Sequence, residues 1–521
     1  MQSPRLIVCA LALAVFLLAL AARAPDLNLF PTQDEDNWLE RGSAFRAALQ
    51  RQDWRATYRS GHPGVTTMWL ATLGMGDLAQ PLVDRTARQV TRVAEFMPAL
   101  EAARHAMIVF NAGLIALIVL LAGRLVGWAP AIIAGLLLAF EPFFVAHGQV
   151  VHLDAPVSGL MAVAMLGAAN RWMASGPVGL LVLSAIAGGL AFVTKSPSAF
   201  LVLAIPALAL IGLRPWGGVK PARRWIIELA LWVTLAGITA FAVWPALATT
   251  PVETISRMVR FTLAEGGQPH RPGNFFMGQP VADPGPLFYP VALAYRLTPV
   301  TLAGLGCLFL VSWWQPRFLK LATPVWALIV LVISFALFMT LGAKKLDRYI
   351  LPAVPLIDVL AGFGLWTAAV DLSARLRGAT QWIQRLPGAL LAAAVLLQPL
   401  AWQSSLPYPL SYYNTALGGG TAAQRMLLVG WGEGLDQAAA YLNAQPDAAS
   451  ATVGVYYPLT VNFQALLLGT AVSLSPSSTA TYVVDYVNAR QRGQSPQLVH
   501  TRVPDHIVRI NGIEYARIYR R

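Results

Sequence analysis

RHAMIVFNAGLIALIVLLAGRLV, residues 104–126, is an apolar stretch with an arginine near each end and no acidic residue. A helix rises about 1.5 Å per residue, so this stretch is long enough to cross the roughly 30 Å hydrocarbon core of a bilayer. The segment therefore predicts a membrane-spanning helix.

Similar apolar stretches recur along the 521-residue chain, which is 56% hydrophobic and 12% charged and has a mean hydropathy of +0.56. A soluble domain carries about 25% charged residues. We therefore expect a mainly α, polytopic membrane helical bundle of about eleven spans. Charge, Pro or Gly bounds each one, at residues 5–22, 104–126, 129–146, 154–173, 178–194, 197–213, 225–247, 290–312, 321–341, 349–370 and 386–403.

The cysteine content and the charge exclude several classes of protein. Cys9 and Cys307 both lie in apolar stretches, which argues against a disulfide framework and a cysteine-based metal site. The net charge of +13 suits cytoplasmic Lys and Arg facing anionic lipid, and no nucleic-acid-binding motif is present. The first stretch, preceded by Arg5 and followed by ALAARA, has a cleaved signal peptide as its alternative, but we prefer an uncleaved first helix.

The distribution of Lys and Arg predicts a cytoplasmic N-terminus, because the basic residues then fall in the cytoplasmic loops. The predicted location is the plasma (inner) membrane. The extracytoplasmic side would hold the long loop 23–103, the turns at 147–154 and Lys195, the loop 248–289, the stretch 344–349 and everything after about 404. The basic residues assigned to the cytoplasm are Arg124, Arg171, Arg214, Lys220, Arg223, Arg224, Arg317, Lys320, Arg375, Arg377 and Arg385.

The chain divides into a transmembrane domain at 1–403 and a small soluble extracytoplasmic α/β domain at 404–521. Strand-like runs occur at 451–458, 480–487 and 506–520, and the last contains an Asn-Gly turn typical of a hairpin. No internal repeat is evident, which argues against an inverted-repeat transporter.

Acidic residues on the predicted extracytoplasmic side are candidate catalytic groups. Asp34, Glu35 and Asp36 follow the first span, and Asp154 begins a later one. A carboxylate held near an acceptor hydroxyl acts as a general base, and neighbouring acids offer oxygen ligands to a divalent metal. The alternatives are a solvated helix-capping cluster at 34–36 and an N-cap at Asp154.

Histidines and cations on the same side are candidate substrate-binding groups. His62, in GHPGVTTMW, and His152, in EPFFVAHGQVVHLDAP, are placed to contact phosphate or substrate, although His62 also suits a turn before a helix. The histidine spacing around His147 and His152 does not favour zinc.

Lys195, in GLAFVTKSPSAF, is either a lysine that extends its charge to the interface or a ligand for a lipid-linked phosphate. In KKLDRYILPAVP, Lys345, Arg348 and Tyr349 lie on the side where basic anchors are uncommon, which indicates a fixed anionic ligand.

Together, acids, cations and apolar grooves on one face suit the transfer of a sugar from a polyprenyl phosphate to a hydroxyl. No Gly-rich nucleotide loop is visible in the sequence. The alternatives are a transporter or flippase of lipid-linked saccharides and a non-catalytic assembly factor. A transporter would place polar residues at mid-membrane in several spans, whereas here the span interiors are nearly free of charge.

Short motifs in a fixed order resemble a known family. These are the acidic pair after the first span, HPG at 62–64, HLDA at 152–155, TKSP at 194–197, K-x-x-R-Y-x-x-P at 345–352, PLSYYNTALGGG at 409–420 and WGEGLDQAAAYL at 431–442. From about residue 5 to 445, the chain resembles the bacterial protein O-mannosyltransferase-like (phospholipid carrier-dependent) branch of the GT-C glycosyltransferases. Lipid A aminoarabinose transferases are more distant relatives.

The resemblance implies a multi-span bundle, a polyprenyl-phosphate donor of a hexose or related sugar, and inversion at the anomeric carbon. The family's acidic pair corresponds to Asp34 and Glu35, with Asp34 as the base, and its second acid corresponds to Asp154. Its phosphate-binding cations correspond to Lys195 and Arg348. The acceptor is a protein, a lipid or a glycan, and the metal requirement varies across the family.

Overall fold

A computed structural model describes residues 4–84, 89–213, 222–314, 323–401, 403–456, 459–474 and 480–521. Four of the basic residues assigned to the cytoplasm, Arg214, Lys220, Arg317 and Lys320, lie outside the described residues. So do the last two residues of the strand-like run at 451–458.

Helices lie on all eleven predicted segments. They are α1 (Pro4–Arg23), α4 (Val93–Val126), α5 (Trp128–Ala139) with α6 (Pro142–Gln149), α7 (Asp154–Met173), α8 (Val178–Phe192), η3 (Ser196–Phe200) with α9 (Leu201–Leu213), α10 (Ala222–Val243), α13 (Phe288–Arg296) with α14 (Pro299–Trp314), α16 (Thr323–Thr340), η4 (Asp347–Ala353) with α17 (Val354–Arg375), and α19 (Leu386–Leu400).

The expected number of spans needs correction. In the part of the chain that the structure describes, six helices are long and apolar enough to cross a membrane, or up to eight if each bent pair is one span. The helices α8 and η3–α9 are apolar but shorter than this. α7 carries Asp154, Asn170 and Arg171 and is almost entirely buried by its neighbours, so it is less apolar than a lipid-facing helix.

Two predicted spans are bent. α5 and α6 meet at 58°, and α13 and α14 meet at 116°. Pro142 and Pro299 stand at the first helical position after each break, where a proline has no backbone N–H to donate. Each break therefore lies where proline ends one helix and begins the next.

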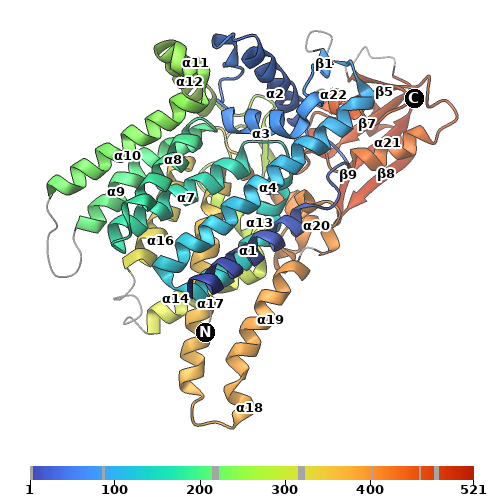
Figure 1. Cartoon of the computed structure of the whole chain (residues 1–521). Coiled ribbons are helices and arrows are strands. Elements are labelled where there is room, and N and C mark those ends of the chain that lie inside the picture. Colours follow the sequence, from blue (N-terminus) through green and yellow to red (C-terminus); the bar gives the residue numbers. More distant parts are fainter. Residues whose placement is uncertain are drawn as a thin grey trace.

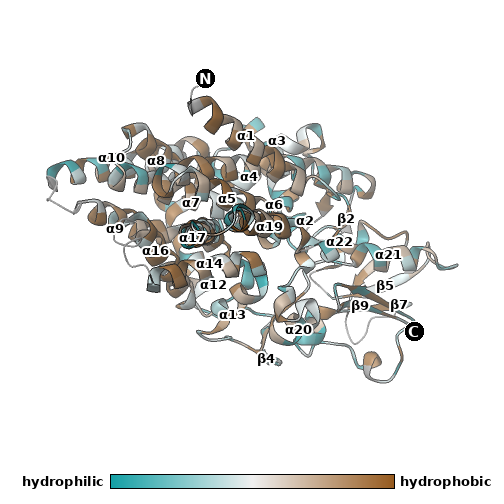
Figure 2. Ribbon diagram, turned by 90° about the horizontal axis from the view of Figure 1, so that it is seen from below, coloured by the Kyte–Doolittle hydropathy of each residue, from teal (hydrophilic) through white to brown (hydrophobic). Residues whose placement is uncertain are grey.

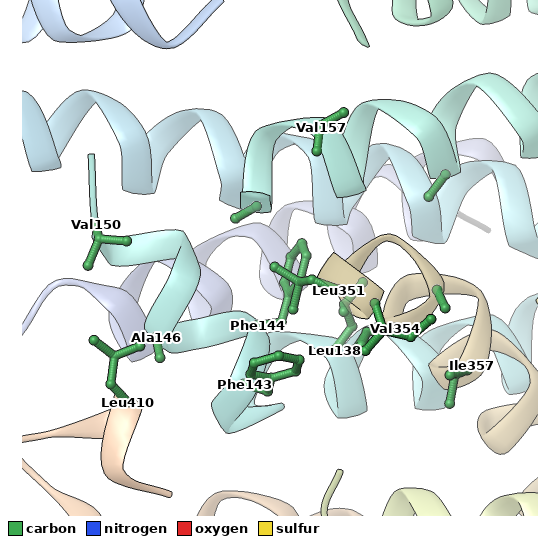
Figure 3. Packing of buried hydrophobic residues seen from close by; sticks show 14 of the residues in the cluster. Leu138, Phe143, Phe144, Ala146, Val150, Val157, Leu351, Val354, Ile357 and Leu410 are labelled. Atoms are coloured by element: carbon green, nitrogen blue, oxygen red, sulfur yellow. The ribbon is translucent and has the colours of Figure 1, made fainter. Parts of the chain in front are cut away.

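The centre of the bundle is α7, which packs against α4 and α8. Gly167 of α7 allows a close approach, because a Cβ there would lie 2.9 Å from the Cβ of Ser184 on α8. Figure 3 shows Phe143 and Phe144 of α6 beside Leu351 of η4, and all three are at most 2% exposed. Hydrophobic residues predominate on the helices of the bundle (Figure 2), and Val202 and Val330 are among those exposed on its outside.

Several shorter elements cover one end of the bundle (Figure 1). They are α2 (Glu35–Gln50), α3 (Val65–Met75), α11 (Pro245–Thr249), α12 (Pro251–Gly266) and the hairpin of β1 (Val83–Asp84) with β2 (Gln89–Val90). A second hairpin, of β3 (Asn274–Phe276) with β4 (Gln279–Val281), pairs with Leu427 through Phe276. The N-terminus and the helix α18 (Gln381–Gln384) lie at the other end.

The C-terminal region contains a five-stranded sheet in the order β6-β5-β7-β9-β8. β5 pairs in parallel with β6 and β7, whereas β9 pairs antiparallel with β7 and β8. The predicted Asn-Gly turn joins β8 to β9, and Asn511 and Gly512 both have positive φ values, 50° and 76°. The strands are β5 (Thr452–Val455), β6 (Thr470–Ser473), β7 (Tyr482–Tyr486), β8 (His506–Ile510) and β9 (Ile513–Arg520).

Short helices α20 (Gly419–Met426), α21 (Leu435–Asn443), α22 (Thr460–Gln464) and α23 (Val487–Gln491) accompany this sheet. The three strand-like runs predicted from the sequence cover β5, β7, β8 and β9, but not β6, whose four residues, TAVS, have no clear alternation. The region is bound to the bundle, since the Asn414 N–H donates to the Tyr295 carbonyl at 2.7 Å. The domain boundary at 403/404 stays a prediction.

Candidate active site

A pocket of about 320 Å³ lies where the loop after α1 meets loops of the bundle and of the C-terminal region. Its lining comes from segments far apart in the sequence. It includes Asp34, Arg41, His62, His147, His152, Lys195, Glu265, His270, Arg296, Lys344, Asp347, Arg348, Tyr349, Trp431, Glu433, Asn488 and Arg492.

Asp34 immediately precedes α2 and enters the pocket with 31% of its side chain exposed. Its Oδ2 atom accepts hydrogen bonds from Arg348 Nη2 at 3.2 Å and from Trp431 Nε1 at 3.1 Å. His152 Nε2 lies 3.7 Å from the same oxygen. Asp34 makes no side-chain cap bond to α2, so its carboxylate is directed to the pocket rather than to the helix.

Asp154, the first residue of α7, is 2% exposed and forms an ion pair with Lys195. His152 Nδ1 lies 2.8 Å from Asp154 Oδ2, and Arg348 Nε lies 3.5 Å from the same atom. His152 and Arg348 therefore both bridge Asp34 and Asp154. The predicted convergence of the two acids is present in the structure.

Aromatic rings support the cations of the site. The Lys195 ammonium lies 4.5 Å from the centre of the Tyr349 ring, and the Arg348 guanidinium lies 4.5 Å from the centre of the Trp431 ring. Such contacts attract a cation to the ring face and limit its motion. The two cations are thus held in place before any ligand binds.

The surroundings of Asp34 favour its ionised form. Burial raises the pKa of the carboxyl, but Arg348, His152 and the Trp431 N–H together hold the pKa below its usual value of 3.8. For Lys195, burial lowers the pKa from the usual 10.5, and Asp154 offsets only part of that effect.

The acids next to Asp34 do not reach the pocket. Glu35 is fully buried, and its carboxylate accepts from Arg104 Nε at 2.8 Å, from the Val151 N–H at 2.8 Å and from the Thr32 N–H at 2.7 Å. Asp36 contacts the side-chain amide of Asn37 at 3.1 Å. The three carboxylates therefore point in different directions, although they are adjacent in sequence.

A divalent metal at residues 34–36 would need these oxygens to converge, and they do not. Across the part of the chain that is described, no group of three or more His, Cys, Asp or Glu side chains is arranged to hold a metal ion.

The structure brings His62 and Lys344 to the pocket but not Lys345. His62 lines the pocket beside Phe261, with ring centres 4.8 Å apart, and burial with nearby Lys195 and Lys344 lowers its pKa to about 3. Lys345 is 2% exposed and points away, with Nζ 2.7 Å from Asp283. Its neighbour Lys344 lines the pocket instead and pairs with Glu265.

Sequence reasoning missed several pocket residues. Trp431 lies in WGEGLDQAAAYL, which was singled out only as part of the family resemblance. Arg296 Nη2 lies 2.6 Å from Asp347 Oδ2. Arg296 belongs to no recognisable motif, whereas Asp347 lies within KKLDRYILPAVP but was not nominated. Arg492 comes from the last part of the chain, where nothing in the sequence suggests proximity to residue 34.

A second pocket of about 390 Å³ adjoins the first and has a mostly apolar lining. Pro197, Ala199, Leu263, Phe338 and Met339 line it, from η3, α12 and α16. The two pockets share His62, Lys195, Glu265, Lys344 and Tyr349. A molecule with a charged head and an apolar tail can therefore occupy both.

Comparisons with known proteins agree with this architecture. Residues 81–245 match a family model described as dolichyl-phosphate-mannose-protein mannosyltransferase. The crystal structure of ArnT from Cupriavidus metallidurans bound to undecaprenyl phosphate is similar with a TM-score of 0.50 and 16% identity, covering 98% of this chain and 97% of that chain. The chain shares the fold of this GT-C glycosyltransferase, and the family model that residues 81–245 match also describes a glycosyltransferase.

The GT-C fold class predicted from the sequence is thus confirmed. The archaeal oligosaccharyltransferase AglB from Archaeoglobus fulgidus, in complex with an inhibitory peptide and a dolichol-phosphate, also matches. Its TM-score is 0.48 at 13% identity, over 94% of this chain and 70% of that chain. A search among curated proteins gave no match.

Proposed function

We propose that this protein with the GT-C fold is a glycosyltransferase that moves a hexose or related sugar from a polyprenyl-phosphate donor to a hydroxyl acceptor at the Asp34 pocket. The observation that carries the proposal is the bridging of Asp34 and Asp154 by His152 and Arg348, beside an apolar pocket. The acceptor is a protein, a lipid or a glycan.

The donor would bind across both pockets. Its lipid tail would lie against Ala199, Leu263 and Met339, and its phosphate would contact Lys195 and Arg348 at the junction. Phosphate oxygens suit the planar guanidinium of Arg348, which the Trp431 ring already supports. Tyr349 and His62 would complete the wall around the phosphate, and Lys345 would hold the loop through Asp283.

The transfer would be a single displacement. The acceptor oxygen forms a bond to the anomeric carbon while the bond from that carbon to the phosphate oxygen breaks, which inverts the configuration. The electron pair leaves on the polyprenyl phosphate, whose charge Lys195 and Arg348 stabilise. The acceptor proton passes to Asp34, which acts as general base, while Asp154 holds Lys195 and His152 in place.

We place the pocket on the extracytoplasmic side of the inner membrane. The basic residues Arg375, Arg377 and Arg385 lie around α18, at the opposite end of the molecule from α2 and α3 (Figure 1). The positive-inside rule assigns that end to the cytoplasm.

The test is incubation of the purified protein with a panel of polyprenyl-phosphate sugars, with donor consumption as the readout. Asp34→Asn should reduce transfer by about 10²-fold or more, because it removes the base but not the side-chain volume. Asp26→Asn is a matched control, since Asp26 is exposed and has a positive φ of 59° that asparagine tolerates.

A wild-type protein that consumes none of the donors would refute the proposed activity. An Asp34→Asn variant as active as the Asp26→Asn variant would instead refute the role of Asp34 while leaving the activity in place.

A further inference from the structure

The segment 431–433 of the C-terminal region is bound directly to the loop that carries Asp34. The Gln33 N–H donates to the Trp431 carbonyl at 2.8 Å, and the Gly432 N–H donates to the Tyr486 hydroxyl at 2.9 Å. Gly432 has φ of 132°, and a Cβ there would lie 2.6 Å from the Pro31 carbonyl oxygen. Only glycine allows this approach of the two backbones.

The Trp431 side chain touches the main groups of the site and is 8% exposed. Its Nε1 donates to Asp34 Oδ2 at 3.1 Å, and its ring lies beneath the Arg348 guanidinium. The ring centres of His152 and His147 lie 5.0 and 5.5 Å from that of Trp431. No other aromatic side chain in the described ranges donates a hydrogen bond to Asp34.

The two oxygens of Asp34 have different surroundings. Oδ2 accepts hydrogen bonds from Trp431 and Arg348, whereas Oδ1 has no hydrogen-bond partner among the described residues. An oxygen whose lone pairs already accept two hydrogen bonds is a poorer proton acceptor than one that accepts none. Oδ1 is therefore the oxygen left to take a proton.

We propose that Trp431 is a positioning residue for the transfer reaction, whose N–H fixes Oδ2 of Asp34 and leaves Oδ1 to accept the proton of the acceptor hydroxyl. The inference rests on the proposed function, in which Asp34 is the base. It gives the C-terminal region a direct part in the active site.

The test compares Trp431→Phe with the wild type. Phenylalanine keeps a ring beneath Arg348 but removes the N–H donor. We expect kcat to fall about tenfold, the KM for the donor to stay unchanged, and the acid limb of the kcat profile to move to higher pH. The shift has this sign because the lost hydrogen bond favours the ionised carboxylate. Trp382→Phe is the control, since Trp382 on α18 is 73% exposed.

Gly432→Ala provides a second route to the same conclusion. It retains the indole but forces segment 431–433 away from Pro31, so we expect the same shift of the acid limb. Wild-type kcat and pH profiles in Trp431→Phe and Gly432→Ala would overturn the inference while the proposed function stood. Failure of the wild type to consume any donor would count against the proposed function instead.

Discussion

Lys195 and Asp154 form an ion pair that is nearly withdrawn from solvent, with 5% and 2% of their side chains exposed. Removing one partner of such a pair leaves an uncompensated buried charge, which typically costs about 3–5 kcal/mol. Lys195→Met should therefore lower both the thermal stability in detergent and the binding of the donor phosphate.

The double variant Lys195→Met, Asp154→Leu separates these two effects. We expect it to recover most of the stability, because apolar groups replace both charges, but not the sugar transfer. Recovery of transfer together with stability would show that the ion pair has a structural role only.

The burial of His62 predicts that the stability of the folded protein falls as the pH is lowered. Its pKa is about 3 in the folded protein against the usual 6.5, so below pH 6.5 the unfolded chain binds a proton that the folded chain does not. His62 therefore destabilises the protein increasingly as the pH falls from 7 to 5, by about 1–2 kcal/mol.

The check is the melting temperature of wild type and His62→Gln at pH 7 and pH 5. The variant should lose less stability than the wild type on acidification. Equal losses in the two proteins would mean that His62 is protonated in the folded state.

At the scale of single residues, the sequence predicted the chemistry better than the direction of each side chain. Asp34 and Glu35 are adjacent, but Asp34 enters the pocket and Glu35 binds Arg104 in the interior. Lys344 and Lys345 diverge in the same way. Residue type and position nominated Asp34, Glu35 and Lys345, but neighbouring side chains in a loop point in directions that only the packed backbone determines, so that Lys344 rather than Lys345 lines the pocket.

At the scale of elements, the two bent helix pairs meet at one buried polar cluster. Glu141 stands at the break between α5 and α6, and Thr298 stands at the break between α13 and α14. Thr301 Oγ1 lies 3.0 Å from a carboxylate oxygen of Glu141 and 3.0 Å from one of Asp358. A hydroxyl has one hydrogen, so one of these two contacts must be donated by a protonated carboxyl.

This count predicts the effect of substitutions at Glu141. Glu141→Gln resembles the protonated side chain and should change stability by less than about 1 kcal/mol, whereas Glu141→Ala should cost about 1–3 kcal/mol. Thermal unfolding in detergent distinguishes the two variants. If glutamine were as destabilising as alanine, Glu141 would be ionised and Asp358 would be the protonated carboxyl.

The helices themselves were predictable because a long apolar segment is a strong signal on its own. The breaks are harder to predict. The apolar stretches 129–146 and 290–312 each predict one continuous span, although Pro142 and Pro299 mark the positions of the bends. The only sign of the burial of α7 in its sequence is the presence of Asp154, Asn170 and Arg171, because its other residues are as apolar as those of a lipid-facing helix.

At the scale of the whole molecule, the pocket forms from segments whose proximity is a property of the tertiary fold. Trp431 and Asp34 lie in the C-terminal region and the first loop, and no periodicity or motif relates their positions. The order of the short motifs predicted which acids and cations of the bundle belong to the site. The contribution of the C-terminal region arises only when that region packs against the bundle.

The apolar pocket beside the site predicts a dependence on the length of the donor lipid. Ala199→Trp would fill part of this pocket, so the KM for a long-chain donor should rise about tenfold while a donor with a short lipid is less affected. Val202→Trp is the matched control, because Val202 is 74% exposed and does not line the pocket. Equal effects on both donors would place the lipid elsewhere.

The orientation of the bundle is testable because the chain has only two cysteines. In a Cys9→Ser, Cys307→Ser background, a single cysteine at exposed Gln50, the last residue of α2, reports on the pocket end of the molecule. A cysteine at exposed Thr380, before α18, reports on the opposite end. The positive-inside rule predicts that a membrane-impermeant maleimide labels Gln50→Cys in intact spheroplasts and Thr380→Cys only after permeabilisation. The reverse pattern would place Asp34 in the cytoplasm, where nucleotide-linked sugars are available and a lipid-linked donor would offer no advantage.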